Sequence, residues 1–326
     1  MSVPNQVTPI LSPQAAAVLA QAERTEDVRL SPDGTRLIIA GFTANNCLLF
    51  DFHLDQSTGQ TVPHLTRGTV ITSDTFSQPH GIDFVGDHHL AIANRNGFVE
   101  LYALPDTAMS ETMHLRPRRT LRRASLVHSL SSPGSLVSAP APAGKARIFV
   151  CNNYAHCVTE HIFSLTRHHL PARNHIALDR GFVLPDGVTL SPDGRWLAIS
   201  SHNTRCIVIY DMTRYERRRT IAVGFLFGVL YPHGMRFSAD GRRLYVSDAG
   251  TPNVSVFHSD DGTWDGPRDP LTTLRVMDDE TFLRGNYNPQ EGGAKGVELA
   301  GDLLITTCEY QPLSFLRLEG RMLPQK

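Results

Sequence analysis

The sequence predicts an all-β protein folded as a six-bladed β-propeller. Three observations lead to this prediction: one pattern recurs six times along the 326 residues, apolar residues alternate within each copy, and Asp-Gly pairs separate short apolar stretches. Alternation with a period of two indicates half-buried strands, and Asp-Gly is typical of hairpin turns. Small antiparallel sheets bury their faces by packing radially, and about six of them close a ring.

Each copy of the pattern is expected to form one blade of a single domain that spans residues 1–326. The copies begin near residues 26, 79, 132, 185, 232 and 295. In the copy from residue 185, alternating apolar pairs predict three successive strands: Val188 and Leu190, Leu197 and Ile199, then Ile207 and Ile209. The last copy needs residues from both chain ends, so we expect the two termini to close the ring together. The alternative is a seven-bladed ring with a degenerate blade hidden in residues 103–130 or 250–293.

Charge and composition exclude several classes of protein. The 31 basic and 32 acidic residues give a net charge of -1, so we expect neither a nucleic-acid partner nor a membrane surface. No apolar run is long enough to span a bilayer and the N-terminus lacks a signal-peptide pattern, which predicts a cytoplasmic protein. The five cysteines form no CxxC pair and are expected to be reduced. The basic run at residues 116–123 is expected to be a solvated loop or an outer strand.

Two copies carry a resemblance to known propeller families. SPDGRWLAISSHNTRCIVIYDM from Ser191 and PHGMRFSADGRRLYVSDAGTPNVSVF from Pro232 resemble the YVTN-type repeats of lactonase-like propellers. The placement of a Glu in the first blade and of Asp-Gly in a later one is similar to the six-bladed gluconolactonase, regucalcin and paraoxonase group. The resemblance implies a hydrolase of the lactonase type. His80-Gly81 stands where the regucalcin-like group has a calcium-binding Asn-Gly, which disfavours calcium, an ion that prefers oxygen ligands.

Two sets of polar residues are expected at one mouth of the central channel, where the innermost strand of every blade begins. The position before the repeat glycine holds five ionisable side chains and one proline: Glu26, His80, Pro133, Asp186, His233 and Lys295. The second set follows the second strand of several copies and is expected to bind substrate: Asn94, Arg95, Asn152, His202, Asp248 and Glu309.

Three interpretations of these side chains remain open. The first is a site for one divalent metal ion, with Zn, Mn or Fe favoured over Ca, whose ligands would be Glu26, His80, Asp186 and His233. The second is metal-free acid–base catalysis, in which His80 or His233 is the base, oriented by Asp186 or Asp248. Lys295 or Arg95 would then stabilise an oxyanion. The third is a polar channel mouth that simply holds water.

The sequence therefore predicts a lactonase-like hydrolase that acts on a small polar metabolite at the channel mouth. His80, Asp186, His233 and Lys295 are its candidate catalytic residues. The long stretch at residues 285–293 is a candidate lid over this mouth. No nucleotide-binding motif and no GxSxG elbow occur, so no nucleotide cofactor is expected. The alternative is a non-catalytic propeller that serves as a ligand-binding scaffold or binds a protein partner.

Overall fold

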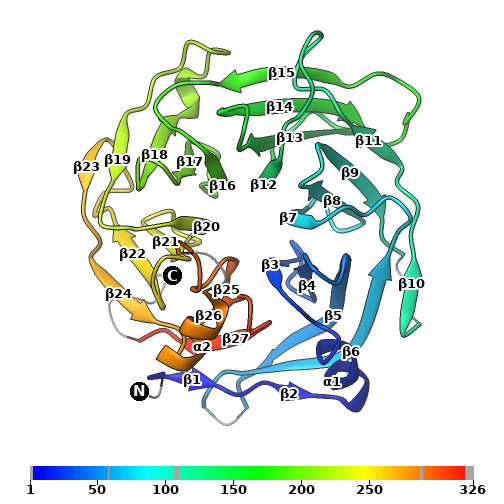
Figure 1. The fold of residues 1–326 in the computed structure, drawn as a ribbon, viewed down its shortest axis with the longest axis vertical. Coiled ribbons are helices and arrows are strands. Elements are labelled where there is room, and N and C mark those ends of the chain that lie inside the picture. Colours follow the sequence, from blue (N-terminus) through cyan, green and yellow to red (C-terminus); the bar gives the residue numbers. More distant parts are fainter. Residues whose placement is uncertain (1–2, 58, 106–109, 287–288, 320–326) are drawn as a thin grey trace.

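The computed structural model describes residues 3–57, 59–105, 110–286 and 289–319. Within these residues the strands form six sheets, arranged around one axis as the blades of a propeller (Figure 1). The innermost strands β3, β7, β12, β16, β20 and β25 surround the axis. The chain is thus the six-bladed, all-β propeller that the repeats predict.

The first three blades follow the chain from the axis outwards. Blade 1 contains β3 (Thr25–Leu30), β4 (Arg36–Gly41), β5 (Asn46–Asp55) and β6 (Val62–Thr72), with β2 (Ile10–Leu11) and β10 (Thr112–His114) parallel to β6. Blade 2 contains β7 (Pro79–Phe84), β8 (His89–Asn94), β9 (Phe98–Ala103) and β11 (Arg119–Leu121). Blade 3 contains β12 (Pro133–Ala139), β13 (Lys145–Asn152), β14 (Cys157–Ser164) and β15 (Arg173–Leu178).

The last three blades repeat this order and complete the ring. Blade 4 contains β16 (Pro185–Leu190), β17 (Trp196–Ser201), β18 (Cys206–Asp211), β19 (Gly224–Leu226) and β23 (Gly266–Arg268). Blade 5 contains β20 (Pro232–Phe237), β21 (Arg243–Asp248), β22 (Asn253–His258) and β24 (Thr272–Arg275). Blade 6 contains β25 (Val297–Ala300), β26 (Leu303–Thr306), β27 (Ser314–Arg317) and β1 (Gln6–Val7). The helical segments are α1 (Pro13–Leu19), η1 (Met212–Arg214) and α2 (Asp279–Gly285).

Both chain ends contribute to blade 6. Strand β1 pairs antiparallel with β27, with Gln6 opposite Leu316 and Val7 opposite Phe315. The N-terminal strand therefore lies at the outer edge of the last blade, and its hydrogen bonds tie the beginning of the chain to its end (Figure 1).

The stretches considered for a seventh blade have other roles. Residues 103–130 supply β10, which extends blade 1, and β11, the outer strand of blade 2. Residues 250–293 supply β22, β23, β24 and helix α2, whose strands belong to blades 4 and 5. Within the residues that the structure describes, the seven-bladed alternative is therefore wrong. The basic run at residues 116–123 includes β11, so part of it is the predicted outer strand.

The hydrophobic core lies between neighbouring blades. One buried cluster joins blades 1 and 2 through Ile38, Leu49, Ile82 and Ile92, and similar clusters fill the other interfaces. Each sheet thus buries both faces against its neighbours, which is why the ring must be complete. All five cysteines are buried and free, as expected. None of the helices in the described part of the chain has the length and apolar character needed to cross a membrane.

The repeat glycine allows the innermost strands to come close together near the axis. A Cβ on Gly187 would lie 1.9 Å from the backbone oxygen of His233 in the next blade, and one on Gly81 would lie 2.4 Å from Ser135 Cα. Blade 1 has Asp27 at this position, and its Oδ2 accepts a hydrogen bond from the Ile82 amide at 3.1 Å. Burial raises the pKa of Asp27 to about 6, although Arg29 acts to lower it.

Candidate functional site

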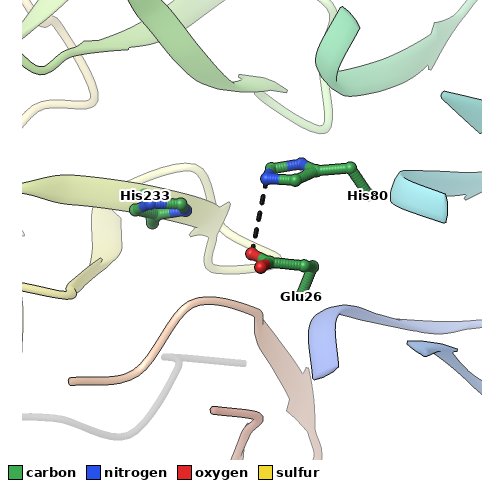
Figure 2. A group of neighbouring side chains, drawn as sticks. All are labelled: Glu26, His80 and His233. Carbon is green, nitrogen blue, oxygen red and sulfur yellow. Dashed lines mark ion pairs between the residues drawn. The ribbon is translucent and has the colours of Figure 1, made fainter. Parts of the chain in front are cut away.

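Five of the six residues that precede the repeat glycine gather near the axis. Glu26, His80, Asp186, His233 and Lys295 are all buried, with at most 4% of each residue exposed. Figure 2 shows three of them, Glu26, His80 and His233, pointing toward one another from different blades. We call these five residues, together with the Arg24, Arg95, His202, Glu291 and Glu309 side chains that contact them, the axial cluster.

Asp186 and His233 form a carboxylate–imidazole pair within the axial cluster. His233 Nδ1 lies 3.0 Å from Asp186 Oδ2. The other carboxylate oxygen accepts from Arg95 at 2.9 Å and from Asn153 at 2.8 Å. Burial acts to raise the pKa of Asp186, but His233 and Arg95 lower it well below the ordinary value, so the group is a carboxylate. Because Nδ1 donates to Asp186, the Nε2 atom of a neutral His233 carries a lone pair, and this buried atom has no partner among the described residues.

His80 occupies the same repeat position as His233 but has a different environment. Its Nε2 lies 2.8 Å from Arg95 Nη2, a donor, so this nitrogen must be the acceptor. Burial and the neighbouring Arg95 lower the pKa of His80 to about 3, which keeps the ring neutral. Glu26 Oε2 lies 3.3 Å from the same nitrogen without making a hydrogen bond (Figure 2). His80 is therefore less available as a base than His233.

Lys295 is a buried ammonium surrounded by carboxylates. Its Nζ lies 2.5 Å from Glu291, and 3.3 Å from both Glu26 and Glu309. Burial would lower the pKa of Lys295, but these carboxylates raise it. Arg24 reinforces the arrangement, since its Nε lies 2.5 Å from Glu26 and 3.2 Å from Glu309. Lys295 is thus a fixed positive charge and is poorly suited to act as a nucleophile.

The residues that we expected to bind substrate divide into two groups. Arg95, His202 and Glu309 belong to the axial cluster. The second group contains Asn94, Asn152 and Asp248, and each is the last residue of its strand. Their side chains bind the loop that leads into the innermost strand of the same blade and do not join the axial cluster. Their oxygens accept from backbone amides: Asn94 from Ser77, Asn152 from Ser131, and Asp248 from Leu230, Tyr231 and Gly250. The structure gives these three residues a role in holding loops.

Sequence reasoning missed several members of this site. Arg24 lies two residues before Glu26, and period-two alternation could have identified it. Glu291 comes from the candidate lid at residues 285–293, outside the repeat, so its pairing with the predicted residue Lys295 had no counterpart in the other copies. Residues 287 and 288 of that candidate lid lie outside the described residues. Tyr231 stacks on His202 with 3.9 Å between ring centroids.

Two groups of side chains in the axial cluster have the donor types of a metal site. They are Glu26 with His80 and His233, and Asp186 with His202 and His233. In each group one ligand atom per residue lies within 4.8 Å of the others. The four predicted ligands are thus divided between two groups that share His233, and His202 joins the second.

The second group offers more available nitrogen atoms to a divalent metal ion. The Nε2 atoms of His202 and His233 are buried without a partner among the described residues, whereas His80 Nε2 is engaged with Arg95. Burial lowers the pKa of His202 to about 4, so its ring is neutral at physiological pH. Two imidazole nitrogens and a carboxylate suit a first-row divalent ion, and these residues therefore fit such a group.

Comparisons with solved structures support the fold. No protein-family model matches this chain, and no curated protein matches it in sequence. A crystal structure described as a "putative gluconolactonase" is similar over 92% of this chain and 91% of its own, with a TM-score of 0.56 and 15% identity. A functionally unknown protein from Desulfotomaculum acetoxidans DSM 771 is similar over 92% of this chain and 84% of its own, with a TM-score of 0.56 and 13% identity. At such low identity the likeness shows the propeller fold alone.

Proposed function

We propose that this propeller is a lactonase-like hydrolase that acts on a small polar metabolite at the axial cluster. The observation that carries the proposal is the Asp186–His233 pair, whose carboxylate lies 3.0 Å from Nδ1 while Nε2 has no partner among the described residues. A base held in one tautomer by a carboxylate is the arrangement that general-base hydrolysis needs. Arg95 and Arg24, with 19% and 27% of their side chains exposed, connect the buried cluster to the surface.

The reaction follows from these positions. His233 Nε2 takes a proton from water, whose oxygen forms a bond to the ester carbonyl carbon, while Asp186 stabilises the imidazolium. The Arg95 guanidinium contacts Asp186 and so lies beside the base, where its charge stabilises the carbonyl oxygen as it becomes negative. The ring C–O bond then breaks, and His233 returns the proton to the departing alkoxide. Lactone and water thus give one hydroxy acid.

A divalent metal ion would be an alternative occupant of the same residues, because it would take the His233 Nε2 lone pair that otherwise serves as the base. Held by Asp186, His202 and His233, it would polarise the carbonyl and lower the pKa of a bound water. Elemental analysis of protein purified without chelators tests this part, and we expect the metal content to fall in His202→Ala. An equal metal content in the variant and the wild type would remove His202 from the ligand set.

The proposed activity is tested with a panel of lactones and a pH-indicator assay. We expect hydrolysis by the wild type and a loss of at least a hundredfold in His233→Gln. His175→Gln is the matched control, because His175 forms an ion pair with Glu160 in blade 3, away from the axis. Hydrolysis by His233→Gln at the wild-type rate would refute the proposal, whereas a non-catalytic scaffold predicts no hydrolysis by either protein.

A further inference from the structure

A pocket of about 520 Å³ lies where blades 6 and 1 meet, beside the axial cluster. Glu23 and Arg24, which precede β3, line one side, and Thr43, which follows β4, lines another. Glu309 and Tyr310, which follow β26, also line the pocket. We call this cavity the seam pocket. Arg24 and Glu309 belong to both the seam pocket and the axial cluster, so the two regions adjoin.

One residue that lines the seam pocket, Glu309, has a buried acceptor without a donor. The Glu309 side chain is only 2% exposed, and its Oε1 lies 3.2 Å from Arg24 and 3.3 Å from Lys295. Its Oε2 is buried without a hydrogen-bond partner among the described residues, and so is Oε2 of Glu26. A buried carboxylate oxygen without a donor is costly, so a ligand that brings a donor is stabilised there.

The cations beside the pocket are already engaged. Arg24 Nε contacts both Glu26 and Glu309, and Lys295 contacts three carboxylates. Arg284 lies over the Tyr310 ring, 4.6 Å from its centroid. Carboxylates outnumber cations around the pocket: Glu23, Glu26, Glu291 and Glu309 against Arg24, Lys295 and Arg284. An anionic ligand would therefore meet excess negative charge, whereas a cationic one would neutralise it.

The carboxylates also connect the pocket to the proposed base. Glu26 and Glu309 share Arg24 and Lys295, and a Glu26 oxygen lies within 4.8 Å of a His233 nitrogen. The carboxylates of Glu309 and Glu26 thus form a chain of ion pairs, through Arg24 and Lys295, from the seam pocket towards His233.

We infer that the seam pocket binds the ammonium group of the substrate through Glu309 Oε2, so that the enzyme acts on amine-bearing rather than anionic lactones. This inference rests on the proposed function for its reaction, but the cation site can be measured without turnover. The ammonium donates a charge-assisted hydrogen bond to Oε2, and Glu23 at the rim adds attraction.

The binding experiment uses three ring compounds that differ in one group. Cyclopentylammonium, cyclopentanol and cyclopentanecarboxylate are titrated at neutral pH into chelator-treated wild-type protein and followed by ligand-observed NMR. We expect cyclopentylammonium to bind about tenfold or more tightly than cyclopentanol, and cyclopentanecarboxylate to bind most weakly. Binding of cyclopentylammonium no tighter than that of cyclopentanol would overturn the inference.

Two variants assign the preference to the pocket. Glu309→Gln keeps an acceptor for Arg24 but presents a donor to the ligand, so we expect the preference for cyclopentylammonium to disappear. Thr43→Lys places a positive charge on an exposed lining position, away from the buried ion pairs, and should reduce the preference, whereas Thr43→Gln should not. An unchanged preference in both Glu309→Gln and Thr43→Lys would place the cation elsewhere and refute the assignment.

The hydrolysis experiment separates this inference from the proposed function. The substrates are α-amino-γ-butyrolactone, γ-butyrolactone and γ-carboxy-γ-butyrolactone, and we expect kcat/KM to fall in that order. Hydrolysis of all three without preference for the amino compound would overturn the inference and support the proposed function. Selective binding of cyclopentylammonium at Glu309 without hydrolysis of any lactone in the panel would support the cation site and contradict the proposed function.

Discussion

Replacing Asp186 with Asn tests the tautomer of the proposed base. The wild-type carboxylate accepts from His233, Arg95 and Asn153, at 3.0, 2.9 and 2.8 Å. The amide keeps two acceptor bonds only if its oxygen faces Arg95 and Asn153, so its N–H must face His233 Nδ1. Nδ1 then becomes the acceptor, and the proton moves to Nε2. The variant thus removes the lone pair that would take a proton from water.

The size of the effect follows from this exchange. A base in the wrong tautomer costs about 10³–10⁴-fold in kcat/KM, or about 4–5.5 kcal/mol. Multiple-bond ¹H–¹⁵N NMR on histidine-labelled protein measures the tautomer without any substrate, and we expect Nδ1–H in the wild type and Nε2–H in Asp186→Asn. Glu160→Gln is the control, because this buried carboxylate pairs with His175 outside the cluster. Retention of Nδ1–H in Asp186→Asn, or activity within threefold of wild type, would refute the reasoning.

Three further predictions concern stability measured by urea denaturation. Gly187→Ala should lose about 3 kcal/mol or more, because its Cβ would lie 1.9 Å from a backbone oxygen, whereas Gly262→Ala, at φ +78° in open space, should lose about 1–2 kcal/mol. Burial raises the pKa of Asp27 to about 6, so the wild type loses stability through this group as pH rises from about 4 to 6. Asp27→Asn does not titrate there and should gain up to about 3 kcal/mol relative to wild type across that window. A stability difference that stays constant over this pH range would contradict the prediction. Lys295→Met leaves buried carboxylates without their cation and should cost about 3–5 kcal/mol, whereas the exposed Lys145→Met should change stability by less than about 0.5 kcal/mol.

The repeat made much of the arrangement predictable. One position in successive copies of a pattern becomes one position in successive blades, so the residues before the glycine were expected to meet near the axis. Glu26, His80, Asp186, His233 and Lys295 do lie there, all of them buried. The glycine explains why these residues come so close to one another, because its lack of a Cβ lets neighbouring innermost strands approach.

Side-chain direction and partners were not predictable to the same degree. Asn94 and Arg95 are adjacent in sequence, yet Asn94 accepts from the Ser77 amide while Arg95 reaches Asp186. The apolar pattern ends with the strand, so no periodicity distinguishes the two residues there. Glu291 lies outside the repeat altogether, four residues before Lys295, so no equivalent position in the other copies could identify it. The pairing of ionisable residues depends on differences of a few ångströms between side chains, and the sequence alone does not give these distances.

The two Pro-His-Gly segments show how neighbouring blades decide the chemistry of a repeated residue. In each case the preceding blade has a carboxylate at the equivalent repeat position: Glu26 precedes His80, and Asp186 precedes His233. The environments of the two histidines differ because of the residue that follows the second strand of each blade. This residue is Arg95 in blade 2 and the buried Ala249 in blade 5. Arg95 occupies the Nε2 atom of His80, whereas the methyl group of Ala249 offers His233 no such donor. The same local sequence therefore gives two different imidazoles. His80 is bound to the Arg95 guanidinium, whereas His233 is bound to the Asp186 carboxylate through Nδ1 and can accept a proton at Nε2.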